Sequence, residues 1–166
     1  MNDNGTWHTG EPASARVRCG TNPAHRILVV DDDISVRQLT TEVLVHSGYH
    51  VDTAEDGAAA WDTLQINSYD LLVTDHNMPR VSGVELLKKL RAARMALPTI
   101  LVSGAIPTEE LNRHPWLQIG ATLLKPYTIP ELLGTVREVL RATDDSREPV
   151  APPGRQSQPP VVGLQL

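Results

Sequence analysis

The sequence predicts an α/β domain with a doubly wound, five-stranded parallel sheet. Between residues 26 and 142, short apolar runs alternate with longer segments whose apolar residues recur at helical spacing. Runs such as 27–30 (ILVV) and 71–73 (LLV) have no polar face, as strands covered on both sides require. Consecutive βα units imply right-handed crossovers, a parallel sheet and helices on both faces.

The first half of the domain predicts three strands joined by two helices. In the first helix, Val36 and Leu39 belong to an apolar stripe, and Gly48 provides a stop signal. In the second helix, Leu64 faces inward. The expected strands are residues 27–30, 49–54 and 71–74, and the expected helices are 34–47 and 56–66.

The second half predicts three further helices and two further strands. Val84, Leu87 and Leu90 share the apolar side of the clearest helix, whereas Pro115 interrupts the next one. Pro130 occupies a tolerated first-turn position in the last helix. The expected helices are residues 83–95, 108–117 and 129–140, and the expected strands are 99–102 and 121–124.

Composition divides the chain into three zones. Residues 1–25 mix Gly, Asn, Thr, Pro and Arg without a period and are expected to form a disordered arm. Residues 26–142 make one domain of ordinary size, with an aliphatic core because aromatic residues are only 4% of the chain. Residues 143–166 are expected to form a Pro-rich disordered tail.

Charge and cysteine content exclude several classes of protein. A net charge of -5 argues against a general nucleic-acid surface. Cys19 is the only cysteine, so no disulfide can form within the chain, which fits a reducing compartment. Neither a signal peptide nor a membrane span is apparent. We therefore expect a cytoplasmic protein.

Polar residues follow four of the buried strands. Asp31 and Asp32 follow the first, Asp75 follows the third, Ser103 the fourth and Lys125 the fifth. In doubly wound sheets, ligands bind beyond the carboxyl ends of the strands, where the strand order reverses. The sequence therefore predicts a site at this edge.

Converging carboxylates predict a bound cation. Two like charges about 4 Å apart repel by roughly 4 kcal/mol at an effective dielectric constant near 20. An oxygen-only ligand set suits Mg²⁺, and Lys125 adds a fixed positive charge. A cation, a lysine and a hydroxyl around one carboxylate form a receptor for a phosphoryl group, with Asp75 as the nucleophile.

Four motifs in this order resemble the receiver domain of two-component response regulators. They are ILVVDDD, VTDHNMP, LVSGA and LLKP, and the stretch AEDG after the second strand is also typical. The resemblance covers residues 26–142. It implies a flavodoxin-like (βα)5 fold with strand order 2-1-3-4-5.

The resemblance also implies a role for each matching residue. Asp75 matches the phosphoacceptor, which ligates the metal as well. Asp32 matches the direct Mg²⁺ ligand, whereas Asp31 acts mainly through water. The backbone carbonyl of Asn77 matches the third protein ligand.

Three further residues match the signalling and folding features of this family. Ser103 matches the switch hydroxyl that moves to the phosphoryl oxygen. Lys125 matches the invariant lysine, and its bond to Pro126 is expected to be cis. Asp33 is expected to cap the following helix.

Four positions depart from the family pattern or attract a different interpretation. Thr122 stands three residues before the lysine, where the family often has an aromatic switch residue, so the coupled aromatic movement is in doubt. Pro115 and Trp116 also make the nearby face atypical. His76 lies beside the nucleophile, and we expect a solvent-facing loop histidine there and not a general base.

The resulting hypothesis is a phosphorylation-dependent interaction switch or phosphorelay member. Its phosphodonor would be a sensor histidine kinase or a histidine phosphotransfer protein, and its output an unknown partner protein. It would not be an enzyme, beyond slow autodephosphorylation. No DNA-binding or membrane contact is visible.

Two alternatives remain open at this stage. A phosphatase of the haloacid dehalogenase type also uses an Asp nucleophile with Mg²⁺, and Asp31 and Asp33 offer its D-x-D spacing. A receiver-like scaffold would bind partners without phosphorylation. An enzyme turns over phosphate esters, a receiver is modified once, and a scaffold does neither.

Overall fold

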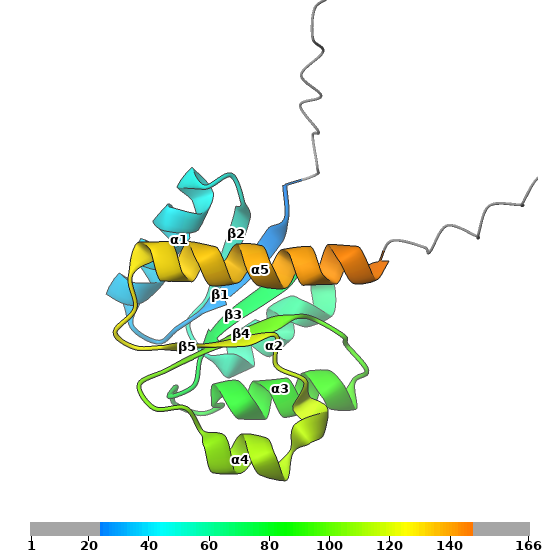
Figure 1. The fold of residues 1–166 in the computed structure, drawn as a ribbon. Coiled ribbons are helices and arrows are strands. Elements are labelled where there is room, and N and C mark those ends of the chain that lie inside the picture. The colour runs from blue at the N-terminus through cyan, green and yellow to red at the C-terminus, as the bar shows by residue number, and fades with distance from the viewer. Residues whose placement is uncertain (1–23, 148–166) are drawn as a thin grey trace, which may run out of the picture.

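The computed structural model describes residues 24–147, which form a five-stranded parallel sheet covered by helices on both faces (Figure 1). The strand order is β2-β1-β3-β4-β5, as predicted. The strands are β1 (Arg26–Val30), β2 (His50–Ala54), β3 (Leu71–Asp75), β4 (Thr99–Ser103) and β5 (Ala121–Leu124). The helices are α1 (Ile34–His46), α2 (Gly57–Ile66), α3 (Gly83–Ala92), α4 (Thr108–Arg113), the 3₁₀ turn η1 (Pro115–Leu117) and α5 (Ile129–Arg147).

The alternation of side chains along β1 explains why this strand is apolar throughout. Ile27 and Val29 pack into a core with α1 and α5, whereas Leu28 and Val30 pack into a second core with α2 and α3. A third cluster joins α3, β4 and η1. The sheet is thus covered on both faces, and the site lies at its open carboxyl edge.

Three helices differ from the prediction by more than one residue toward their carboxyl ends. α3 ends at Ala92 and not at residue 95, because Arg94 adopts a left-handed conformation with φ of 57°. The segment 108–117 is split into α4 and η1 at His114, the residue before Pro115. α5 continues to Arg147, so the first residues of the expected tail are helical.

The last turns of α5 make two contacts beyond the predicted end of the helix. The hydroxyl of Thr143 donates to the Val139 carbonyl at 2.9 Å. Nε2 of His25 lies 3.4 Å from the carboxylate of Asp144, and this contact ties the helix to the start of β1. The remaining parts of the predicted arm and tail, with Cys19, lie outside the described residues.

Capping side chains fix the helix starts next to the site. Asp33 is the N-cap of α1, as predicted, and its Oδ1 accepts from the amides of Ser35 and Val36. Ser82 and Glu85 form a capping box at the start of α3. Between residues 24 and 147, none of the helices has the length and apolar character to span a membrane.

Candidate functional site

The carboxyl ends of four strands bring the predicted residues to one edge of the sheet. Asp31 directly follows β1, Asp75 ends β3, Ser103 ends β4 and Lys125 follows β5. Asp31, Asp75 and Ser103 are buried, with exposed fractions of 6%, 5% and 3%. Burial of two carboxylates at one place demands compensation by a positive charge.

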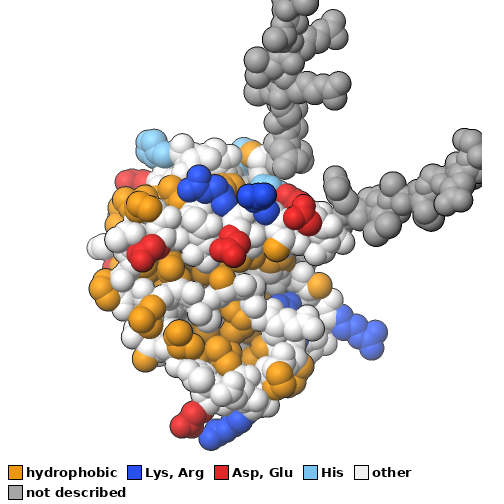
Figure 2. Space-filling model, viewed as in Figure 1, with side chains coloured by type: hydrophobic (Ala, Val, Ile, Leu, Met, Phe, Trp, Pro, Cys, Tyr) orange, Lys and Arg blue, Asp and Glu red, His pale blue; other side chains and the backbone are white. Residues whose placement is uncertain are grey.

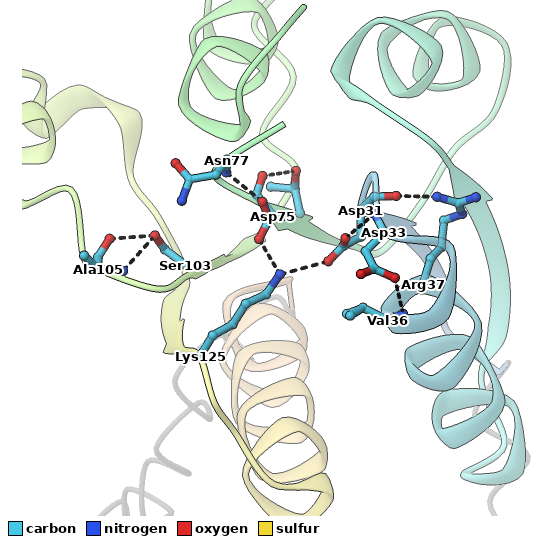
Figure 3. A network of polar contacts seen from close by, with 10 residues as sticks. Asp31, Asp33, Val36, Arg37, Asp75, Asn77, Ser103, Ala105 and Lys125 are labelled. Atoms are coloured by element: carbon cyan, nitrogen blue, oxygen red, sulfur yellow. Dashed lines mark hydrogen bonds and ion pairs between the residues drawn. The ribbon is translucent and has the colours of Figure 1, made fainter. Parts of the chain in front are cut away.

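Lys125 supplies that charge by bridging the two buried carboxylates (Figure 3). Its Nζ lies 2.6 Å from Oδ1 of Asp75 and 3.1 Å from Oδ2 of Asp31. The Lys125–Pro126 peptide bond is cis, as the family resemblance implies. The ammonium group therefore lies between the predicted nucleophile and Asp31, the first residue of the predicted acidic pair.

Backbone amides hold the other carboxylate oxygens. The amide of Asn77 donates to Oδ2 of Asp75 at 2.7 Å, and the amide of Asp33 donates to Oδ1 of Asp31 at 2.9 Å. These contacts orient both carboxylates toward Lys125. Arg37 also reaches this region, because its guanidinium donates to the backbone carbonyl of Asp31 at 2.5 Å.

Burial and charge shift two pKa values at this edge. Burial raises the pKa of the Asp31 carboxyl above 3.8, and outweighs the lowering by the Asp33 amide and by Lys125. For Lys125, burial would lower the pKa, but the hydrogen bonds and charges of Asp75 and Asp31 outweigh it and raise the pKa above 10.5. Lys125 therefore stays charged at neutral pH.

The donor set at this edge fits a divalent cation. Asp31 and Asp75 share one ammonium group, and Asp32 follows Asp31 in the chain, so the three carboxyl groups leave a surplus of negative charge when they are ionised. In the part of the chain that is described, no group of three acidic, His or Cys side chains is already arranged around a common metal position. Asp32 is exposed, so its side chain can turn toward the site without displacing a packed neighbour.

The hydroxyl of Ser103 points away from Asp75. It donates to the Ala105 carbonyl at 2.6 Å and accepts from the Ala105 amide at 3.3 Å (Figure 3). A Ser103 side chain that contacts a group on Asp75 must give up these two bonds. In this structure, Ser103 is therefore held by Ala105 and not directed at Asp75.

His76 is not the solvent-facing loop histidine that we predicted. Its side chain is half-buried, and its Nδ1 is buried without a hydrogen-bond partner among residues 24–147. The amide of His76 continues the sheet by donating to the Val102 carbonyl at 2.8 Å, and its carbonyl accepts from Gly83 at 3.1 Å. These backbone bonds draw the residue into the edge of the sheet.

An apolar groove of about 470 Å³ adjoins Lys125 between α1 and the start of α5. Leu39, which the helical pattern placed with the core-facing stripe, is 56% exposed and lines this groove instead. The sequence pattern missed the groove because α1 packs chiefly through Leu44, and Val36 and Val43 are only partly buried. Lys125, Pro126 and Tyr127 bound it next to the site, and the remaining lining residues are Val36, Thr40, Val43, Ile129 and Leu132.

A second feature that sequence reasoning missed joins two loops beside the site. The guanidinium of Arg80, in the β3–α3 loop, forms an ion pair with Asp56, in the β2–α2 loop. Asp56 is buried, and its other oxygen caps α2. The Ala-Glu-Asp-Gly stretch offered a signal for Asp56, but nothing in the sequence pairs it with Arg80.

The comparisons with known proteins agree on one family. The model described as "Response regulator receiver domain" matches residues 27–137. The chain is 38% identical over 129 residues to the response regulator MprA of Mycobacterium sp. (strain KMS), an alignment that covers 76% of this chain and 55% of that protein. The chain thus spans about half the length of the curated relatives it matches.

Solved structures show the same fold. The chemotaxis response regulator CheY4 of Vibrio cholerae superposes with a TM-score of 0.65 at 30% identity, over 70% of this chain and 98% of that one. The response regulator TrrA of Thermotoga maritima, solved in complex with Mg²⁺-BeF, superposes with a TM-score of 0.62 at 31% identity, over 69% of this chain and 98% of that one.

Proposed function

The chain belongs to the response regulator receiver family of two-component systems, and on that premise we propose that it accepts a phosphoryl group on Asp75 in a Mg²⁺-dependent transfer. Its phosphodonor is a sensor histidine kinase or a histidine phosphotransfer protein in the cytoplasm. The phosphorylated chain then acts as an interaction switch or passes the phosphoryl group on in a phosphorelay.

The observation that carries this proposal is the position of Lys125 Nζ between Asp75 and Asp31. A phosphoryl group brings additional negative charge to an edge that already holds three carboxyl groups. Such a transfer depends mostly on position and charge neutralisation. Lys125 provides one positive group, and Asp31, Asp32, Asp75 and the Asn77 carbonyl are the oxygens that would hold Mg²⁺.

In the proposed covalent step, Asp75 is the nucleophile. One carboxylate oxygen forms a bond to phosphorus while the bond from phosphorus to the donor imidazole breaks, and the imidazole leaves with a proton. Bound Mg²⁺ would supply further positive charge to the phosphoryl oxygens. Lys125 keeps its ion pair with the site, and Ser103 turns from Ala105 toward a phosphoryl oxygen.

The apolar groove beside Lys125 suits the docking of the phosphodonor. Leu39 and Ile129 expose apolar surface there, and the groove ends at the lysine that contacts Asp75. A partner helix in this groove would bring its phosphohistidine to the carboxyl edge. Leu39→Asp should therefore slow transfer from a kinase and leave labelling by a small phosphodonor unchanged.

The output face is the strip between α4 and α5. Figure 2 shows apolar side chains gathered between these two helices, with charged groups along α5 above and at the tip of α4 below. Ile106, Trp116 and Leu124, from the elements of this region, are about half exposed. Thr122 is exposed as well, so this face lacks the buried aromatic that often couples it to the switch hydroxyl.

Intact-mass measurement with acetyl phosphate tests the proposal. We expect wild type to gain one phosphoryl group only with Mg²⁺, and Asp75→Asn to gain none. Asp52→Asn, which removes a carboxylate in the middle of β2 that pairs with Arg26, serves as the control and should be labelled like wild type. An unlabelled wild type that binds no Mg²⁺ would leave the phosphorylation-independent scaffold in its place.

A further inference from the structure

We propose that Arg80 and Asp56 form a latch that positions the Asn77 end of the cation site. This inference rests on the proposed function, since Asn77 matters only if the edge binds Mg²⁺. The latch joins the β2–α2 loop to the β3–α3 loop, which carries Asn77 and begins directly after Asp75.

The backbone around Arg80 requires a contact that holds it. Arg80 has φ of 67°, a left-handed conformation that is unfavourable for arginine. The amide of Val81 donates to the Pro79 carbonyl at 2.8 Å, so the chain turns tightly around Arg80. Such a conformation persists only where surrounding contacts determine it.

Asp56 provides that contact from a fixed position. Its side chain is only 2% exposed, and its Oδ1 accepts from the amides of Ala58 and Ala59 at 2.8 Å each. Its Oδ2 faces the guanidinium of Arg80. One oxygen therefore anchors Asp56 to α2, and the other holds the β3–α3 loop.

Next to the latch, the backbones of Gly57 and Val81 approach each other closely and reinforce it. A Cβ atom at Gly57 would lie 2.6 Å from the Val81 carbonyl oxygen and 2.7 Å from its Cγ1, so only glycine permits this approach. The two loops thus meet at consecutive pairs of residues. The chain is thus fixed at Asp75, in β3, and at Arg80 and Val81, so the backbone of Asn77 between them can move little.

The consequence concerns Asn77 and through it Asp75. The Asn77 amide holds Oδ2 of Asp75 at 2.7 Å, and the carbonyl of the same residue is the proposed metal ligand. If the latch opens, both groups lose their fixed position. Arg80 and Asp56 are positioning residues in this account, since neither is proposed to touch Mg²⁺ or the phosphoryl group.

Two substitutions open the latch with little other damage. Arg80→Asn removes the guanidinium, and asparagine tolerates the left-handed conformation. Asp56→Asn keeps an oxygen for the helix cap and removes the negative charge. Arg94→Asn is the matched control, because Arg94 also has a left-handed backbone, with φ of 57°, at the opposite end of α3.

Two measurements on the full chain separate the latch from general stability. Without metal, hydrogen exchange of the segment 76–82 should be faster in Arg80→Asn and Asp56→Asn than in wild type. By calorimetric titration, both should bind Mg²⁺ about tenfold more weakly, the size of effect that supporting residues have at metal sites. The double variant should lose no more than either single one, and Arg94→Asn should match wild type in both measurements.

The outcomes distinguish the two proposals. If wild type binds Mg²⁺ and Arg80→Asn binds it equally well, the latch is overturned and the proposed function stands. If wild type binds no Mg²⁺, the proposed function fails and the latch fails with it. A weaker affinity in Arg94→Asn as well would show a general loss of stability and would also overturn the latch.

Discussion

The two ends of the same sheet differ in how their charged side chains are paired. Near the amino end, Arg26 lies 2.6 Å from the carboxylate of Asp52, which also accepts from the hydroxyl of Tyr69 at 2.8 Å. The guanidinium of Arg26 lies over the Tyr69 ring, 4.8 Å from its centroid. At the carboxyl end, Asp31 and Asp75 share the single ammonium group of Lys125.

Arg91 shows the same matching of donors and acceptors near the amino end. Its guanidinium donates to four backbone carbonyls and thereby holds the segment after η1 against α3; the acceptors are Met95, Leu97, Leu117 and Gln118. Within one sheet, the charged groups near the amino end are thus paired or hydrogen-bonded, whereas the carboxyl end carries surplus negative charge, where we propose that Mg²⁺ binds. Burial makes surplus negative charge costly, so such a surplus is retained where a bound ligand compensates the charge.

The largest expected effect is that of Lys125→Met on phosphorylation. Removal of a positive group from the reacting carboxylate should slow labelling by acetyl phosphate by about a hundredfold or more. Arg26→Met removes a positive charge from the other end of the sheet and should leave the labelling rate unchanged. The labelling rates are measured by intact mass over time. Equal rates for Lys125→Met and wild type would contradict the proposed difference between the two ends of the sheet.

Mg²⁺ should stabilise the fold through the carboxyl end alone. At a hundred times its dissociation constant, a ligand that binds only the folded state adds about 2.7 kcal/mol to the free energy of unfolding. Thermal melting should show this gain in wild type and in Asp52→Asn, and a much smaller gain in Asp32→Asn. A gain that Asp32→Asn keeps in full would remove Asp32 from the cation site.

Tyr69→Phe, near the amino end of the sheet, should lower the free energy of unfolding by about 1 kcal/mol, the usual net value of one hydrogen bond. Burial and the nearby Asp52 raise the pKa of Tyr69 from 10.0 to about 12. Because the folded-state pKa is the higher one, this contribution is present below pH 10 and is lost as the pH rises toward 12. Denaturant titrations should show a steeper alkaline loss in wild type than in Tyr69→Phe, with unchanged phosphorylation of both.

The smallest expected effect concerns the pH dependence of the metal-free carboxyl end. Burial raises the folded-state pKa of Asp31 above 3.8, so its favourable contribution exists in acid and is lost as the pH rises through the folded-state value. The free energy of unfolding of Asp31→Asn, relative to wild type, should therefore increase from acid toward neutral pH. A difference that stays constant with pH would contradict a raised pKa.

The sequence allowed the sheet and the position of the site to be predicted for a physical reason. Strands buried on both faces leave unmistakable apolar runs, and parallel strands end at one edge. Asp31, Asp75, Ser103 and Lys125 therefore had to converge once the strand order 2-1-3-4-5 was given. The strands and helices follow from local pattern, whereas the strand order was implied by the resemblance to receiver domains.

Features that depend on long-range contacts could not be predicted. The extension of α5 to Arg147 accompanies a contact between His25 and Asp144, which are far apart in the chain. The ion pair of Arg80 with Asp56 bridges two loops that are apart in the sequence. The left-handed backbone of Arg80 could not be predicted either, because an arginine does not indicate a positive φ. Leu39 shows the same limit, because helical spacing places it on a face but does not say what covers that face.

Localisation of the phosphoryl group tests the central claim most directly. Borohydride reduces an acyl phosphate on aspartate to homoserine, and trypsin then separates Asp31 from Asp75 by cleaving after Arg26, Arg37 and Arg80. We predict Mg²⁺-dependent homoserine at residue 75, in the peptide 38–80, and none in the peptide 27–37. Homoserine at residue 31, or an equal yield at residue 75 without Mg²⁺, would contradict the central claim. That claim is that the negative charge at the carboxyl edge binds a cation and that Asp75 accepts the phosphoryl group beside it.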